Sequence, residues 1–279
     1  MAIELATKYL PYVDEIFKAE SKKSLLTNDD FDWTGAHTIK VYKIGTAPMN
    51  DYDRAGTGEN ASRYGKITDL EATTQTMLVT KDRSFTFVID KLDSNETGGA
   101  LEAATALARQ LREVVIPEVD EYTYRKMCDG AGTKPAAKTL DSTNIYNEII
   151  SATTVLDDNE VNEVGRVLLV VPAVYQMMKD SEKIVLNTNI GDDLRQHGVI
   201  SNLDGMNVVK VSSKRVPKNF GFMVAHPCAT VAPTKLADYR THQDPPGISG
   251  TLTEGRISYD AHVLDNKKMA IYYQERQPS

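Results

Sequence analysis

The sequence predicts an α+β fold, and three stretches of the chain indicate it. Residues 36–80 contain two β-rich runs around a polar loop, which is typical of a long projecting hairpin. Residues 97–128 carry apolar side chains at spacings of three and four, as a long amphipathic helix does. Residues 136–254 alternate helical and strand-like segments, which is α+β or α/β material. The 279 residues suit either one elaborate domain or two lobes around a shared core.

The N-terminal part of the chain is poor in core-forming side chains. Pro11 can begin a short helix with Phe17 on its apolar face. Residues 38–44 read as a strand, and residues 46–65 hold hardly an aliphatic side chain before strand character resumes near Lys66. A loop this long is usually functional, and a two-stranded projection is marginal alone. We therefore expect both the N-terminal segment and the hairpin to lie against a partner surface.

A strand and a long helix follow the hairpin. After a tight turn at Lys81-Asp82, residues 83–90 alternate apolar and polar side chains as a half-buried strand does. The helical pattern of residues 97–128 corresponds to a rod of about 45 Å at about 1.5 Å per residue. Pro117 is expected to kink or divide this helix, and the glycines and proline of residues 130–135 end it.

The remainder of the chain mixes both kinds of element. Helices are predicted over residues 144–156 and from Pro172 onward. Residues 241–250 read as a surface loop, and two β-rich runs close the chain within residues 255–274, joined by a turn at Asp265-Asn266. The strands predicted between these elements are 167–171, 183–186, 199–211 with a turn at Asp204-Gly205, 220–225 and 228–232.

Composition and charge narrow the class of protein. The net charge of −7 argues against a surface that grips nucleic-acid phosphates along its length, although acidic surfaces that face packaged nucleic acid without adhering to it would give the same balance. Cys128 and Cys228 have no metal-ligand spacing around them, which favours a reducing compartment. The most apolar run, residues 166–175, is too short to span a bilayer, and we expect neither an export signal nor a membrane anchor.

No catalytic, cofactor-binding or metal-binding residue is predicted. Residues 56–61 and 130–134 carry glycines of phosphate-binding loops without the required strand-to-helix context. Residues 157–162 have Asn where a calcium loop needs Gly, and residues 247–251 lack the final glycine of a nucleophile elbow. The five histidines are scattered without ligand spacing: His37, His197, His226, His242 and His262.

The order of segments, together with three β-rich stretches, resembles a known family. The stretches are GVISNLDGMNVVKV (198–211), NFGFMVAHPCATVAP (219–233) and GRISYDAHVLDNKKMAIYY (255–273). Arm, long hairpin, strand, very long helix, mixed lobe and closing strands together resemble the major capsid proteins of tailed bacteriophages, which have the Hong Kong 97 fold. The resemblance covers nearly the whole chain.

The resemblance implies a domain plan and a mode of assembly. Residues 1–35 would be the N-terminal arm, 36–80 the extended loop, 81–135 the peripheral domain with its spine helix at about 97–128, 136–254 the axial domain, and 255–279 the C-terminal strands returning to the peripheral domain. Arm and loop would contact neighbouring subunits. We expect these intersubunit contacts at Pro48, Tyr52, Arg54, Arg63, Tyr64, Phe17 and Trp33.

The family's partners follow from the same resemblance. The chain would form pentamers and hexamers in an icosahedral shell that is assembled in the host cytoplasm and becomes the virion capsid. Scaffolding and portal proteins would bind it, and the binding of decoration proteins stays open. Packaged double-stranded DNA would touch it non-specifically, and no cofactor or membrane would be involved. The chain starts directly at the arm, without the scaffolding region that some members carry. The lysine-to-asparagine cross-link of other members is not carried over, because no motif fixes Lys66 and Asn266 as its partners.

Two alternatives to a phage capsid subunit stay open. One is the shell subunit of an encapsulin-like nanocompartment with the same fold, for which the sequence shows no cargo groove. The other is a soluble enzyme with an unusual loop. A shell subunit assembles, whereas an enzyme would be a stable monomer of 30.9 kDa with measurable turnover.

Overall fold

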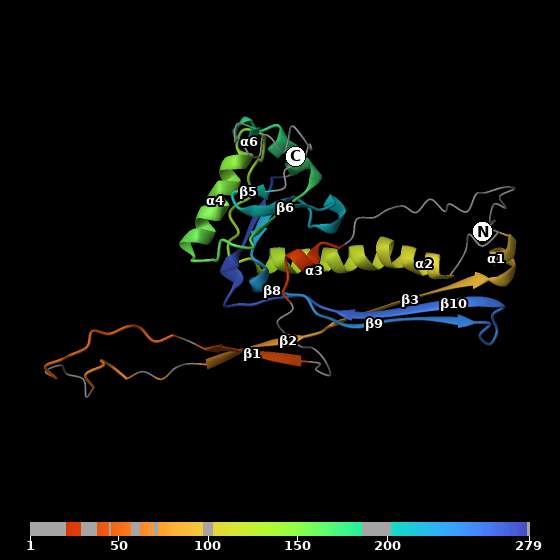
Figure 1. The fold of residues 1–279 in the computed structure, drawn as a ribbon, viewed down its shortest axis with the longest axis horizontal. Helices are drawn as coiled ribbons and strands as arrows, with labels where there is room; N and C mark the ends of the chain where they lie inside the picture. The colour runs from red at the N-terminus through yellow and green to blue at the C-terminus, as the bar shows by residue number, and fades with distance from the viewer. Residues whose placement is uncertain are drawn as a thin grey trace. The chain divides into compact units, whose positions relative to one another are not determined.

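The computed structural model describes residues 21–28, 38–44, 46–56, 62–67, 69, 72–96, 103–185 and 202–277. They belong to two compact units, of which Gly35–Leu78 is one and the segments on either side of it form the other. We call these the loop unit and the body. Figure 1 shows the elements of both, and the combination of helices and sheets confirms the predicted α+β class.

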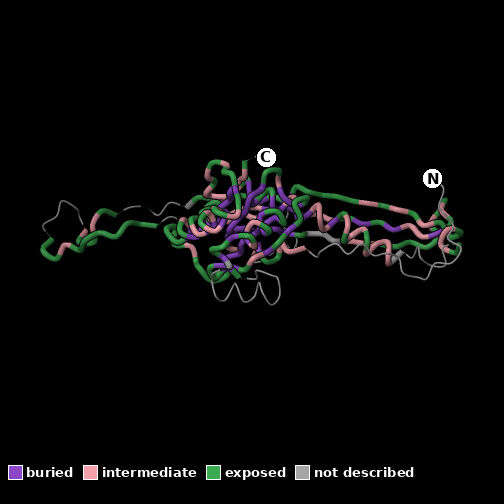
Figure 2. The backbone as a smooth tube through the Cα atoms, turned by 90° about the horizontal axis from the view of Figure 1, so that it is seen from above, coloured by how far each residue is buried: buried purple, intermediate pink, exposed green. Residues whose placement is uncertain are grey.

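A five-stranded sheet forms the centre of the body, with the strand order β12-β7-β4-β6-β5. β4 runs parallel to β6 and antiparallel to β7. Every residue of β4 and β7 is buried, as expected for strands covered on both faces. Figure 2 shows most buried residues gathered in this region. The strands are β4 (Val167–Val170), β5 (Asn202–Leu203), β6 (Met206–Lys210), β7 (Phe220–Ala225) and β12 (Ile271–Glu275).

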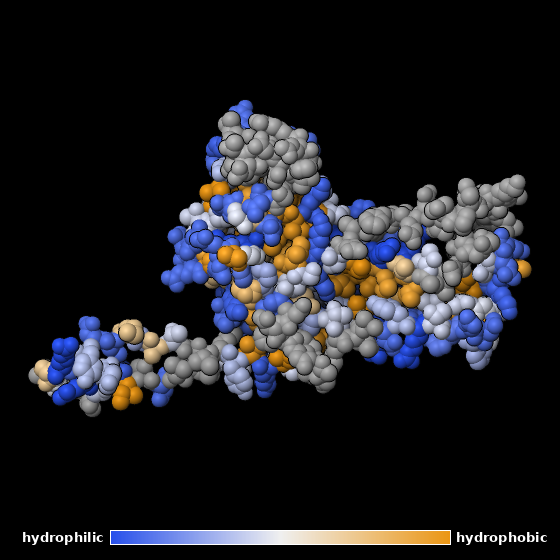
Figure 3. Space-filling view, viewed as in Figure 1, coloured by the Kyte–Doolittle hydropathy of each residue, from blue (hydrophilic) through white to orange (hydrophobic). Residues whose placement is uncertain are grey.

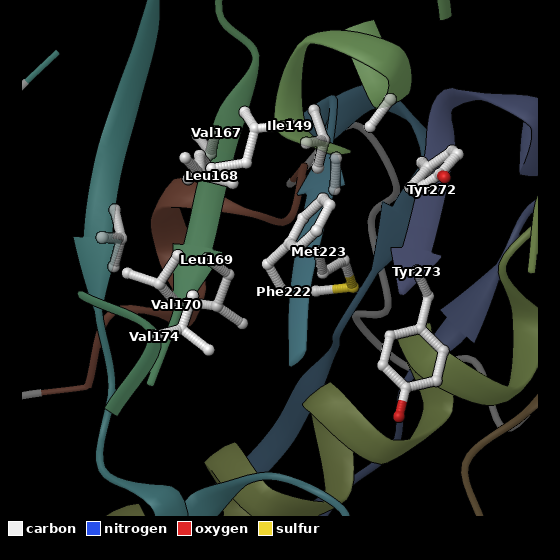
Figure 4. Packing of buried hydrophobic residues seen from close by; sticks show 14 of the residues in the cluster. Ile149, Val167, Leu168, Leu169, Val170, Val174, Phe222, Met223, Tyr272 and Tyr273 are labelled. Carbon is white, nitrogen blue, oxygen red and sulfur yellow. The ribbon is translucent and has the colours of Figure 1, made fainter. Parts of the chain in front are cut away.

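Helices α4 (Ile145–Asp158) and α5 (Pro172–Lys179) pack into the same core and confirm the predicted helices. Figure 4 shows Ile149 of α4 and Val174 of α5 among the side chains of β4 and β7. The strand predicted at 183–186 is wrong, because Glu182–Val185 forms the short helix α6. Only Ile184 of its described side chains is buried, which one helical turn achieves without a sheet partner.

Two predicted strand regions differ in detail from the observed ones. The predicted turn at Asp204-Gly205 is confirmed: both residues have positive φ, 52° and 73°, and they connect β5 to β6 as a tight hairpin. The strand predicted at 228–232 shortens to β8 (Thr230–Val231), since Pro227 begins a 3₁₀ turn that runs to Ala229. β8 pairs with β11 (His262–Val263).

The long helix of the body runs without a break through α2 (Ala103–Gln110), a π-helical turn (Leu111–Val115) and α3 (Ile116–Gly130). Proline within a helix lacks a donor and its ring crowds the carbonyl four residues earlier. Here Pro117 neither ends the helix nor divides it. The π turn directly before it, in which the Ile116 N–H bonds to the Leu111 carbonyl, widens the helix at that point. The helix ends at Gly130, as predicted.

A three-stranded antiparallel sheet, β3-β10-β9, lies along this helix. Its strands are β3 (Lys81–Asp90), β9 (Thr234–Gln243) and β10 (Gly250–Tyr259). The turn predicted at Lys81-Asp82 is wrong, because both residues pair with Ser258 and Tyr259 at the start of β3. The loop predicted at 241–250 is shorter than expected, since β9 and β10 extend into it from either side.

Side chains at the helix–sheet contact form a second, smaller core. Val115 and Val119 of the helix pack with Tyr259, and Phe85 and Ile257 border them. Figure 3 shows hydrophobic atoms along α2 and α3. On the inner face, Phe85 and Phe87 are half-buried, which confirms the alternation predicted for β3.

Gly255 of β10 occupies a position that only glycine fits. Phe85 and Tyr239 stack beside it with ring centroids 6.1 Å apart. A Cβ at this position would lie 2.4 Å from Phe85 and 2.8 Å from Tyr239. The two aromatic rings therefore occupy the space that the missing side chain leaves.

The sheets do not follow the domain boundary expected after residue 254. That boundary falls inside β10, whose ten residues all pair with β3. β12 joins the five-stranded sheet through β7 instead of extending the three-stranded sheet. Stacked rings hold this pairing, with Phe220 and Tyr273 5.5 Å apart and Phe222 and Tyr272 6.2 Å apart.

Residues 21–28 are fixed to the body. Leu26 is fully buried in the main core. The Asn28 N–H bonds to the Thr230 carbonyl at 2.9 Å, and its side-chain amide donates to the Cys228 carbonyl at 3.1 Å. The chain therefore enters the described part of the body at a defined place.

Candidate interaction surface

The loop unit is built on a two-stranded hairpin. β1 (Thr38–Ile44) pairs antiparallel with β2 (Ala72–Leu78) in unbroken register from Thr38 opposite Leu78 to Ile44 opposite Ala72. β1 matches the predicted strand, whereas β2 begins later than Lys66. Figure 2 shows this unit as mostly exposed, and Tyr42 is 69% exposed on β1. A hairpin of this kind buries little of its own apolar surface.

Beyond the hairpin, hydrogen bonds to Asp53 shape the loop. Its carboxylate accepts from the N–H groups of Ala55 and Gly56, at 3.0 and 2.9 Å, as in an Asx turn. Its own N–H bonds to the Arg63 carbonyl at 2.9 Å and joins the two sides of the loop. Gly56 has a φ of 68°, a conformation that favours glycine, and Arg63 lies beside it.

This bridge brings two tyrosines together. Tyr52 and Tyr64 make an edge-to-face contact with ring centroids 5.0 Å apart. The Asn50 amide donates to the Tyr64 carbonyl at 3.4 Å, and Gly65, with a φ of 87°, leaves room for the Asn50 side chain. The tyrosine pair is therefore positioned by local bonds and stays open to solvent, with Tyr52 51% and Tyr64 78% exposed.

The structure thus brings together Tyr52, Arg63 and Tyr64 of the residues predicted to form contacts. Pro48 and Arg54 are exposed elsewhere in the same loop. Phe17 and Trp33 lie outside the described residues. The prediction missed four exposed apolar side chains of this unit, Tyr42, Met49, Ile67 and Leu78, of which Met49 is 97% and Ile67 82% exposed.

Thr80, at the start of the body's second segment, is held by a buried carboxylate. Asp260 Oδ2 accepts from the Thr80 N–H at 2.9 Å and from the Thr80 hydroxyl at 2.7 Å. Asp260 Oδ1 accepts from the Tyr122 hydroxyl at 2.9 Å and from the Ala261 N–H at 2.7 Å. Burial tends to raise the pKa of Asp260, but these hydrogen bonds outweigh it and hold the pKa below its ordinary value.

Tyr122 is held from several sides at once. Burial and the hydrogen bond to Asp260 raise the pKa of its phenol to about 12, so it stays a donor. The ammonium groups of Lys81 and Lys126 lie 5.2 and 5.6 Å from its ring centroid. The long helix, the residue that precedes β3 and the residue that follows β10 therefore meet at one hydrogen-bonded polar cluster.

A second buried cluster ties the N-terminal segment to the long helix. Asp120 is fully buried, and its carboxylate accepts from Ser21 and, at 2.9 Å, from Arg215. Burial is the largest influence on its pKa and raises it, although Ser21 and Arg215 act in the opposite direction. Arg215 is also buried, so this is an ion pair inside the body.

Among the described residues, no three His, Cys, Asp or Glu side chains are grouped to hold a metal ion. None of the described helices is long and apolar enough to cross a membrane. Cys128 is buried, which raises the pKa of its thiol to about 12. Residues 130–134 follow the end of α3 instead of opening a helix, as predicted.

Comparison with solved structures identifies the fold. No family model and no curated protein matches the sequence. A structure from Mycobacterium phage Che8 aligns with a TM-score of 0.78 over 98% of this chain and 98% of that chain, at 18% identity. The capsid structure of cyanophage P-SCSP1u aligns with a TM-score of 0.74 over 96% and 92%, at 14% identity. A virus-like particle from Pyrococcus furiosus gives 0.52 over 86% of both chains, at 11% identity. The chain therefore has the Hong Kong 97-type fold of phage capsid proteins, as its sequence resemblance implied.

Proposed function

We propose that the chain is the major capsid protein of a tailed double-stranded DNA phage. Its copies form pentamers and hexamers, and these build an icosahedral shell around the genome. The fold, matched over nearly the whole chain, supports this proposal. The observation that carries it is the loop unit, which holds a positioned tyrosine pair and four further apolar side chains in solvent.

Burial against a neighbouring copy would stabilise this surface. Covering an exposed apolar or aromatic side chain contributes about 1.5–3 kcal/mol. Tyr52 and Tyr64 contact each other and are half to largely exposed, so they can be buried together without first being ordered. Closed symmetry then repeats the same contact at every interface of the shell. In this proposal Pro48, Arg54 and Arg63 line the same contact.

The parts of the chain take the roles that the family resemblance implies. Residues 1–35 are the arm, 36–80 the extended loop and 81–135 the peripheral domain. Residues 136–279 supply the axial domain and the closing strands, without a boundary at residue 254, because β10 pairs with β3 along its whole length. The role is structural and not enzymatic. Scaffolding, portal and decoration proteins bind the shell, which forms in the host cytoplasm, and the packaged DNA touches it non-specifically.

Light scattering and electron microscopy of the purified full-length chain test the proposal. We expect closed particles, or capsomers of five and six copies that close into particles when the chain is concentrated. A chain that remains a monomer of 30.9 kDa at every concentration and ionic strength would contradict it.

The second candidate function is a nanocompartment shell that encloses protein cargo instead of a genome. The likeness to the virus-like particle from Pyrococcus furiosus favours it. Nuclease treatment of particles made in a host that carries the phage genes separates the two. Protected DNA of genome length supports the capsid, whereas particles with protein contents alone support the compartment.

A further inference from the structure

A cleft of about 620 Å³ opens in the body between α3 and the chain that follows β6. One wall consists of Glu113, Glu118 and Glu121 along the long helix. The facing wall runs from Lys210 to Arg215, and Lys22 lies at the rim. None of the loop unit's described residues lines this cleft.

The two walls differ in how their charges are compensated. Each glutamate of the helix wall is already paired with an arginine: Glu113 with Arg109 at 3.1 Å, Glu118 with Arg83 at 2.8 Å, and Glu121 with Arg125. Arg215 on the opposite wall is paired with Asp120. The acidic wall is therefore neutralised by its own helix and by β3.

The lysines of the cleft are not compensated in this way. Within the described part of the chain, Lys22, Lys210 and Lys214 form no ion pair with a carboxylate. Lys22 donates to the Lys210 carbonyl at 3.4 Å, and the Lys210 ammonium lies 5.0 Å from the Tyr175 ring centroid. The cleft thus has a net positive rim on a chain whose overall charge is −7.

The inner surface of the cleft is largely apolar. Val114 is 46% exposed on it, and Pro117 and Val211 line it as well. The Tyr124 hydroxyl, fully buried at the cleft, has no hydrogen-bond partner among the described residues.

We propose that this cleft binds an acidic, amphipathic peptide segment of a partner protein. Its carboxylates face Lys22, Lys210 and Lys214, and its aliphatic side chains cover Val114, Pro117 and Val211. The alternative polyanion, duplex DNA, fits less well. Three lysines would release roughly three counterions, fewer than the six to ten phosphate contacts typical of DNA binding, and a rigid duplex cannot cover an apolar floor.

The proposal is independent of the capsid assignment, because its test uses the unassembled full-length chain. The probe is a fluorescein-labelled peptide of sequence GELLEELLG, followed by fluorescence anisotropy. Matched probes replace Glu by Gln or Leu by Ser, and a labelled DNA duplex of about 20 base pairs, roughly two turns, tests the other class of partner. We expect the first peptide to bind saturably. Each matched peptide should have a Kd at least about tenfold higher, a difference of about 1.4 kcal/mol in binding free energy.

Variants of the chain locate the binding. Lys210→Glu combined with Lys214→Glu should lower the affinity of the chain for the peptide by more than about tenfold. Val114→Ser should also lower this affinity, and the loss should depend less on salt concentration. Lys267→Glu combined with Lys268→Glu makes the same charge change on another surface and should leave binding unchanged. Equal binding of the Gln peptide, tighter binding of the duplex, or no binding of any peptide would overturn the proposal. Shell formation is scored separately, so failure of either proposal leaves the other standing.

Discussion

The Tyr122 hydroxyl donates a 2.9 Å hydrogen bond to Asp260, whose second carboxylate oxygen accepts from Thr80. Tyr122 belongs to the long helix, Thr80 follows the loop unit, and Asp260 follows β10. The buried carboxylate of Asp260 therefore joins its own segment to two others. Tyr122 lies 138 residues before it in the sequence, and Thr80 lies 180 residues before it. Within the body, this cluster fixes Thr80 next to the long helix and the segment after β10.

Replacing Tyr122 by Phe tests the strength of that cluster. The change removes one hydrogen bond to a buried charged acceptor, and we expect it to lower the free energy of unfolding at pH 7 by about 1.5–3 kcal/mol. Tyr146→Phe is the matched control, because Tyr146 is also half-buried and makes no hydrogen bond through its hydroxyl among the described residues. Equal effects of the two changes in urea unfolding would refute a special role for Tyr122.

The pH dependence of this variant has a definite sign. The pKa of Asp260 is lowered on folding, so its contribution to stability is present above the ordinary pKa of Asp, about 3.9, and is lost as pH falls through the lowered value. The stability difference between wild type and Tyr122→Phe should therefore shrink in acid. A difference that stays constant from neutral pH into acid would show that it does not depend on the charge of Asp260.

The pair Asp120–Arg215 predicts an asymmetry between its two partners. Arg215→Met leaves a buried carboxylate without its cation and should cost about 3–5 kcal/mol at neutral pH, whereas Asp120→Asn should cost less. Folding raises the pKa of Asp120, so its contribution is largest below the ordinary pKa and is lost as pH rises through the raised value. The cost of Arg215→Met should accordingly fall in acid. Guanidinium unfolding at two pH values measures both effects, and equal costs at neutral pH would contradict this account.

Gly255→Ala should destabilise the body by about 1–3 kcal/mol through overpacking against Phe85 and Tyr239. A second substitution that makes room, Phe85→Leu, should recover part of the loss in the double variant. Thermal unfolding of the two single variants and the double variant gives the coupling energy. Strict additivity would indicate that the rings do not occupy the space above Gly255.

The tyrosine pair of the loop provides a test of assembly separate from stability. Tyr52→Ser combined with Tyr64→Ser removes exposed apolar surface and should change the unfolding free energy by less than about 0.5 kcal/mol. The yield of closed particles in sedimentation should nevertheless fall several-fold. Val164→Ser, at a residue 79% exposed on the body, is the control and should assemble normally. Normal assembly of the double variant would remove these tyrosines from the proposed interface.

The elements that sequence analysis predicted well carry their signal locally. β1 and β7 have the predicted bounds, and α4 lies within two residues of its predicted ends. A short β-rich run marks each strand, and apolar residues at spacings of three and four mark the helix. The strand β9 was not predicted, because the run from Thr234 to Gln243 is polar at most positions on both faces. It forms a strand by pairing with β10, which local sequence does not reveal.

Local sequence patterns could not predict the two buried polar clusters. Asp120 and Arg215 are 95 residues apart, and Thr80 and Asp260 are 180 apart. Nothing in the local composition around either carboxylate shows which donors will meet it. The loop surface was predictable as a region, because residues 46–65 hold hardly an aliphatic side chain. The contact between Tyr52 and Tyr64, however, depends on the Asp53–Arg63 backbone bond.

Deleting residues 46–65 and comparing the product with the full-length chain by light scattering tests the central claim most directly. The hydrogen bonds of Thr80 with Asp260 and the cores of the body do not involve the deleted residues, so the shortened chain should keep its far-ultraviolet circular dichroism and its cooperative unfolding. We expect it to remain a monomer or a small oligomer under conditions in which the full-length chain forms closed particles. Closed particles of normal size from the shortened chain would contradict the claim that this loop holds the copies together.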